Sequence, residues 1–117
     1  TATGLVGIGV TPVADAFLQV AGHIHSTGTT PTVGTCGTSP AVVAGSSDTA
    51  GEIVTGTTAT TACTVTFGTA FATTPICTAN FSSQVAAIQS TPAAGSLVVT
   101  YASQSNATFL YICIGNG

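Results

Sequence analysis

The sequence lacks basic charge altogether. Lys and Arg do not occur among its 117 residues, and only Asp15, Asp48 and Glu52 are acidic, so the formal net charge is −3. Without cations the chain cannot neutralise phosphates, and we expect neither nucleic acid nor an anionic membrane surface as a partner. A surface with so little charge also lacks the usual protection against association. The composition therefore favours a protein that binds further copies of itself.

Signals for helices and membrane spans are also lacking. No window keeps the apolar spacing of an amphipathic helix for long. No run of about 18 apolar residues occurs, so we expect no membrane insertion. Thr is abundant instead, with 24 residues, and its β-branched side chain packs well on a pleated sheet. Together with Gly and Pro at regular intervals, this composition predicts an all-β fold.

Turn signals divide the sequence into short strands at the spacing of a β-sandwich or a small jelly roll. Two strands are predicted near the N-terminus, over residues 5–10 and 16–26. The Gly- and Pro-rich stretch that follows predicts an extended connector or short edge strands. The remaining strands are predicted at residues 41–43, 52–55, 62–67, 76–81, 84–89, 96–101 and 108–114. The last of these is apolar on both faces, which indicates a central strand or one covered by a neighbouring subunit.

The first strand predicts a contact between subunits. Val6, Ile8 and Val10 lie on one face of it, and Leu5 lies on the other face with two glycines. No charge or Pro protects its edge, and a terminal strand can leave its own domain. We therefore divide the chain into an N-terminal strand segment, residues 1–26, and a Cys-containing β-sandwich domain, residues 27–117. Leu5, Val6, Ile8 and Val10 are expected to pair in a sheet with a neighbouring subunit, as a donor strand.

The four cysteines predict disulfides. Cys36, Cys63, Cys77 and Cys113 form no C-x-x-C pair and lie far from both histidines in sequence. Their even number and the missing metal-ligand spacing favour two disulfides in an oxidising compartment over four reduced, buried thiols. Three connectivities are open. We favour Cys36–Cys63 and Cys77–Cys113, because Cys77 and Cys113 each lie in an apolar strand and adjacent strands could bring them together.

No group of side chains in the sequence predicts catalysis. His23, Asp48 and one of ten serines could form a nucleophilic set on paper, but the sequence has no G-x-S-x-G elbow. The three carboxylates are not paired, which argues against glycosidase chemistry. We therefore expect no enzyme activity and no cofactor. Two sequons, at Asn80 and Asn106, permit N-glycosylation, although chance matches are common in a chain so rich in Ser and Thr.

Two parts of the sequence resemble a known family. "VGIGVTPVADAFLQVAG" (residues 6–22) is similar to the "VGIGTTSP…KLxVxG" segment of many bacteriophage tail fibres. The remainder, from "GTTPTVGTCGTSP" through "TACTVTFGTAFATTPIC" to "LYICIG", resembles the Cys-containing C-terminal domain that often follows this segment. The resemblance covers nearly the whole chain. It implies a β-structured fibre component of a virion or extracellular assembly, often trimeric and without enzymatic activity in this region.

The resemblance also bears on the pair His23 and His25. On a strand both side chains point to one face, so a three-fold axis would gather six imidazoles into an octahedral transition-metal site. Some tail fibres resembling this chain bind iron in that way. We expect metal at His23 and His25 only if three chains meet there.

These observations predict the structural subunit of an extracellular, self-assembling fibre or filament that is joined by strand pairing between subunits. The complete absence of Lys and Arg favours a filament whose flanks are covered by identical neighbours. The alternative is a trimeric phage tail-fibre tip whose loops bind a host cell-surface receptor. In either case the expected location is extracellular or on the virion surface.

Overall fold

The computed structural model describes residues 4–116, and none of these residues is helical. It contains ten short strands, which confirms the predicted all-β class. Their bounds are β1 Val6–Ile8, β2 Leu18–Val20, β3 Thr32–Gly34, β4 Ala41–Val42, β5 Ala50–Val54, β6 Thr60–Thr66, β7 Ile76–Phe81, β8 Ile88–Ala93, β9 Ser96–Gln104 and β10 Thr108–Ile114.

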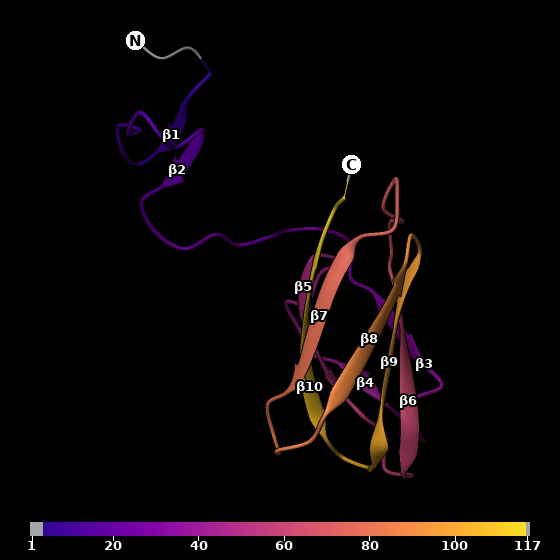
Figure 1. Cartoon of the computed structure of the whole chain (residues 1–117). Helices are drawn as coiled ribbons and strands as arrows, with labels where there is room; N and C mark the ends of the chain where they lie inside the picture. The colour runs from indigo at the N-terminus through magenta and orange to yellow at the C-terminus, as the bar shows by residue number, and fades with distance from the viewer. Residues whose placement is uncertain (1–3, 117) are drawn as a thin grey trace.

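Eight of these strands form two four-stranded antiparallel sheets that pack face to face (Figure 1). One sheet has the order β4-β5-β10-β7 and the other the order β3-β6-β9-β8. The predicted β-sandwich is therefore confirmed. β1 and β2 form a separate two-stranded sheet that lies apart from the sandwich.

The core of the sandwich follows from the alternation of side chains along each strand. In β6, Cys63 and Val65 are buried, whereas the Thr residues between and beside them point outward. The strand thus has one buried and one hydrated face, as an antiparallel sheet allows. Aromatic rings contribute to the core, where Phe81 packs edge-on against Tyr101 and Phe109 with ring centroids 5.1 and 6.3 Å apart. The fully buried apolar side chains include Ile53, Leu97, Val99 and Phe109.

Strand β10 is central in its sheet, between β5 and β7. Its inner side chains, Phe109, Tyr111 and Cys113, are buried in the core. Its outer side chains are also apolar, yet no element of the described chain covers them. Leu110, Ile112 and Ile114 are 45%, 51% and 63% exposed, respectively. The sandwich therefore accounts for one apolar face of this strand, and the other face remains a large hydrophobic surface.

Both disulfides join neighbouring strands or their ends. Cys77 and Cys113 are register partners on β7 and β10, with Cα atoms 4.1 Å apart. Cys36 follows β3 and bonds to Cys63 of β6, across a Cα separation of 4.2 Å. These are the two pairs favoured from the sequence. Two disulfides are typical of proteins that fold in an oxidising compartment.

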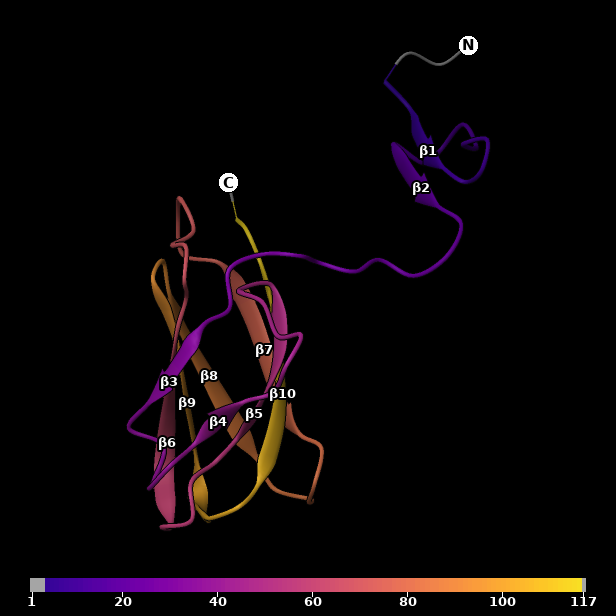
Figure 2. The same ribbon diagram turned by 180° about the vertical axis from the view of Figure 1, so that it is seen from behind.

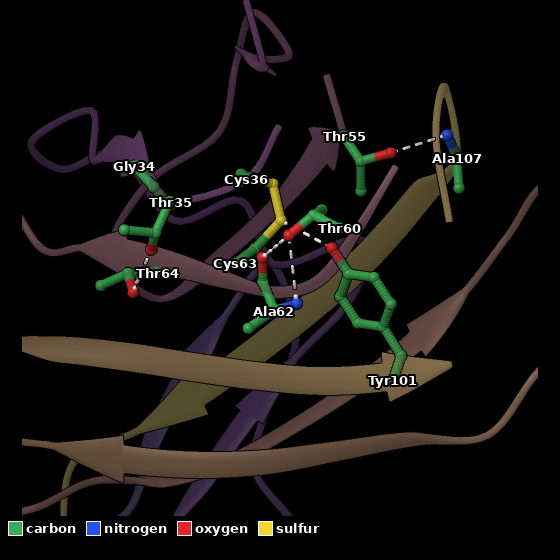
Figure 3. Close-up of a disulfide and its surroundings, with 10 residues drawn as sticks. All are labelled: Gly34, Thr35, Cys36, Thr55, Thr60, Ala62, Cys63, Thr64, Tyr101 and Ala107. Carbon is green, nitrogen blue, oxygen red and sulfur yellow. Dashed lines mark hydrogen bonds between the residues drawn. A yellow bond between two sulfur atoms is a disulfide. The ribbon is translucent and has the colours of Figure 1, made fainter. Parts of the chain in front are cut away.

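The Cys36–Cys63 disulfide is surrounded by hydroxyl groups (Figure 3). The Tyr101 hydroxyl lies 3.0 Å from Cys63 Sγ. Because a disulfide sulfur carries no proton, the phenol must be the donor. The bond satisfies a buried polar group and links β9 to the disulfide on β6.

Asp48 is a buried carboxylate that has no Lys or Arg to pair with. It is only 8% exposed, and the chain has no Lys or Arg. Its two carboxylate oxygens instead accept hydrogen bonds from the backbone N–H groups of Gly68 and Thr69, each at 2.8 Å. Such charge-assisted bonds are among the strong hydrogen bonds of proteins. Asp48 therefore ties the turn before β5 to the loop after β6, a structural role that the sequence did not reveal.

Tyr111 lies beside this turn and should make stability fall at alkaline pH. Its hydroxyl donates to the Ser47 carbonyl at 2.5 Å, and burial, then the nearby Asp48 carboxylate, raises its pKa from 10.0 to about 12. Between pH 10 and 12 the unfolded chain loses a proton that the folded chain keeps, so stability that is intact below pH 10 is lost across this window. We expect a loss of roughly 2 kcal/mol by pH 12.

Urea unfolding measured at several pH values from 8 to 12 tests this expectation. The chain has no Lys, so tyrosines dominate titration in this range. Burial also raises the pKa of Tyr101, and this residue contributes a smaller part of the decrease in stability. Tyr111→Phe should lose most of the pH dependence. An unchanged slope in this variant would show that the phenol is not responsible.

The strands predicted at residues 84–89 and 16–26 have other bounds in the structure. The strand expected at residues 84–89 is β8, Ile88–Ala93, which runs through Pro92. Pro was interpreted as a turn signal, but β8 is an edge strand, where a residue without an N–H group is tolerated. The strand expected at residues 16–26 shortens to β2, and Gly22 follows it with a φ of 135°. Such a backbone conformation suits Gly and ends the strand.

Candidate functional site

Residues 4–22, called the arm below, project from one end of the sandwich (Figure 2). β1 and β2 run parallel within it, with Val6 opposite Leu18 and Ile8 opposite Val20. The ladder is extended by hydrogen bonds from the Val6 N–H to the Phe17 carbonyl, at 2.8 Å, and from the Ala21 N–H to the Ile8 carbonyl, at 2.9 Å. An isolated two-stranded sheet is marginally stable in water, so this element depends on further contacts.

The loop between the two strands covers one face of this small sheet. Gly7 and Gln19 are register partners and share that face. A Cβ at Gly7 would collide with the Val10 carbonyl oxygen and lie 2.8 Å from Cδ of Pro12. Gln19 Oε1 accepts a hydrogen bond from the Val13 N–H at 2.9 Å. Gly7 is therefore required for the loop to fold back over the strand.

The opposite face of the arm is apolar and bare. Val6, Ile8, Leu18 and Val20 share it, because they occupy alternate positions in register on the two strands. Val6, Ile8 and Leu18 are 52%, 58% and 59% exposed. We call these four residues the arm patch. β1 and β2 also each keep one edge whose backbone groups pair with no other strand of the described chain. Exposed apolar patches and open edges are features typical of interaction sites.

The arm differs from the strand that the sequence predicted. The regular strand covers Val6 and Ile8, whereas Leu5 and Val10 lie outside it, and Gly9 ends it with a φ of 72°. Within this single chain β1 pairs with β2, a parallel partner that was not foreseen. The alternation of Leu18 and Val20 was the available signal for β2, but this alternation does not specify the strand with which β2 pairs. Pairing of Leu5, Val6, Ile8 and Val10 with a neighbouring subunit stays a prediction.

The connector, residues 23–31, carries both histidines. His23 and His25 are exposed and lie outside any strand, so the expectation that one strand holds both was wrong. Among residues 4–116, no three His, Cys, Asp or Glu side chains form a group that could hold a metal ion. A site made by three chains stays a prediction.

The connector is hydrogen-bonded to the sandwich at Thr29. Thr29 Oγ1 lies 2.9 Å from Thr69 Oγ1, on the loop that Asp48 holds. A Cβ at Gly68 would collide with the Thr29 side chain, so this glycine lets the connector pack closely. The arm is thus attached through residues that precede Thr29 to a firmly held point on the sandwich.

The two predicted glycosylation sites are both accessible. Asn80 is exposed on the outer face of β7, and Asn106 is exposed in the turn between β9 and β10 with a φ of 50°. Asn80 is also the register partner of Leu110, so a glycan there would stand beside the exposed side chains of β10. Modification of either residue stays a prediction.

Comparison with protein-family models, with curated proteins and with solved structures found no match for this chain. No helix that could cross a membrane occurs in residues 4–116.

Proposed function

We propose that this chain is the structural subunit of a β-rich fibre or filament outside the cell, and that copies are joined through the arm. The arm is the main support for this proposal, because it combines a bare apolar patch with two open strand edges and a connector that separates it from the sandwich. Burying a side chain such as Ile8 contributes about 1.5–3 kcal/mol. Pairing of the open edges with a neighbour would satisfy the free backbone groups as well.

The near absence of charge supports this proposal. An exposed apolar patch on a neutral surface promotes association, which most monomeric proteins suppress with charged residues. In this chain Asp15 is the one charged residue of the arm. Where the flanks of a subunit are covered by identical copies, such a surface is buried and stabilises the assembly. We therefore favour a structural protein over an enzyme.

A trimeric phage tail-fibre tip is the second candidate, and the position of the loops favours it. The connector, the start of β7 and the end of β10 lie at one end of the sandwich, whereas loops 55–59, 82–87 and 105–107 lie at the opposite end (Figure 1). Those distal loops are uncharged, and Val85 is fully exposed on one of them. This is the arrangement that a fibre end needs in order to present loops to a receptor.

The substitution Ile8→Asp tests the role of the arm. Assembly would bury the new carboxylate, and the chain has no Lys or Arg to pair with it. We expect the sedimenting fraction to fall at least tenfold in analytical ultracentrifugation, while the sandwich keeps its disulfides and melting temperature. Thr100→Asp, on the exposed outer face of β9, is the matched control and should assemble normally. Unchanged assembly of Ile8→Asp would reject the proposed function.

A further inference from the structure

A second exposed apolar surface lies on the sandwich itself. Side chains at alternate positions of β10 and at the start of β7 share the outer face of one sheet, because Ile114 and Ile76 are register partners. The members of this surface, called the sheet stripe below, are Ile76, Leu110, Ile112 and Ile114, and Ile76 is 67% exposed.

The sheet stripe matches the arm patch in chemistry and is long enough to cover it. Both consist of four aliphatic residues on two adjacent strands, with two on each strand in the arm patch and three on β10 plus one on β7 in the sheet stripe. Leu110 to Ile114 extends about 13 Å at 3.3 Å per residue, which is long enough to receive the shorter arm patch. Sheets that pack face to face stand about 10 Å apart and bury such rows against one another.

The surroundings of the sheet stripe also favour an uncharged partner. Thr78 and Ala50 flank Ile112, and Asn80 and Glu52 flank Leu110. Glu52 is therefore the charge at its border, and the chain has no Lys or Arg to neutralise it. A basic or an acidic ligand finds no pattern of complementary charges here. The arm patch, which is apolar and uncharged, does fit this surface.

We infer that the arm patch of one copy packs on the sheet stripe of the next copy, sheet against sheet. This inference rests on the proposed function and specifies the acceptor surface. Because the two contacting surfaces differ, the contact is heterologous: each copy donates one arm and receives another. Repetition of this contact extends a chain of subunits unless the rotation between copies closes a ring.

Two single variants and their mixture test the inference. Ile112→Lys places a charge in the centre of the sheet stripe and should reduce the sedimenting fraction at least tenfold, as Ile8→Asp does. Mixed in equal amounts, the two variants should co-assemble in alternation. In the mixture, the acidic arm of one variant meets the basic sheet stripe of the other, and unaltered arms meet unaltered stripes. Thr100→Lys, on the outer face of the other sheet, should assemble normally. Melting temperatures and intact disulfides establish that each variant is folded.

The outcomes separate this inference from the proposed function. If Ile8→Asp fails to assemble while Ile112→Lys assembles normally, the arms bind one another or some other surface, and the inference is wrong although the proposed function survives. If both variants fail alone and the mixture does not recover, the packing of the arm patch on the sheet stripe is rejected. If neither variant changes assembly and each changes only the shape or stability of the single subunit, the arm folds back on its own sandwich. This result overturns both the inference and the proposed function.

Discussion

Removal of either disulfide is expected to lower the free energy of unfolding of the sandwich by about 3–4 kcal/mol. The two bridges span 27 and 36 residues, so each removes considerable loop entropy from the unfolded chain. The two loops follow one another in sequence without overlapping, and their effects should be nearly additive. Loss of both would therefore cost about 6–8 kcal/mol, which is comparable with the whole stability of a domain of this size.

Alanine pairs at Cys36/Cys63 and at Cys77/Cys113, followed by the quadruple variant, measure these contributions in urea. The Cys36/Cys63 variant should lose more stability than the Cys77/Cys113 variant, because the Tyr101 hydroxyl also loses its contact with Cys63 Sγ. The quadruple variant should be largely unfolded at 25 °C. The intact protein should have a mass four hydrogens below the value for free thiols. Losses under 1 kcal/mol, or alkylation of any cysteine without reduction, would contradict this account.

Asp48→Ala is expected to lower the free energy of unfolding by about 2–4 kcal/mol. The substitution removes both acceptors of the Gly68 and Thr69 N–H groups and frees the loop on which Thr29 rests. The point where the connector meets the sandwich should therefore loosen as well. Amide hydrogen exchange of Gly68 and Thr69 should accelerate more than that of β9.

Two further variants make this result specific. Asp48→Asn has nearly the same shape but keeps one acceptor oxygen, so it should lose roughly half as much stability as Asp48→Ala. Asp15→Ala removes an exposed carboxylate from the arm and should change stability by less than about 0.5 kcal/mol. If Asp48→Ala is as stable as Asp15→Ala, the two backbone hydrogen bonds do not hold the loop.

Local patterns in the sequence were sufficient to predict many strands of the sandwich. The strands expected at residues 76–81 and 108–114 match β7 and β10. Cys63 and Val65 alternate with Thr residues along β6, and such a local pattern is sufficient to identify the buried face, since side chains on a strand alternate between its faces. The two apolar faces of β10 indicated a central strand or one covered by a neighbouring subunit, and β10 is central in its sheet.

Features that depend on contacts between distant residues were not predictable in this way. The parallel pairing of β1 with β2 requires knowledge of how the loop folds over Gly7, and no local pattern specifies that. Pro92 indicates a turn unless the strand is known to lie at an edge. Asp48 differs little in sequence context from a solvated turn residue, and its partners lie about 20 residues away. The arm patch and the sheet stripe became visible as surfaces only after their strands were in register.

Negative-stain electron microscopy of the unmodified chain tests the central claim most directly, because assembly through the arm determines the form of the particle. A head-to-tail contact between arm and sheet predicts elongated fibres whose repeat is shorter than the 57 Å length of one subunit, since neighbours overlap where the arm docks. Fibres of this kind, absent from a sample of Ile8→Asp, are the expected result. Uniform particles of a single subunit at every concentration would contradict the claim, and discrete trimers would replace the filament with the fibre-tip alternative.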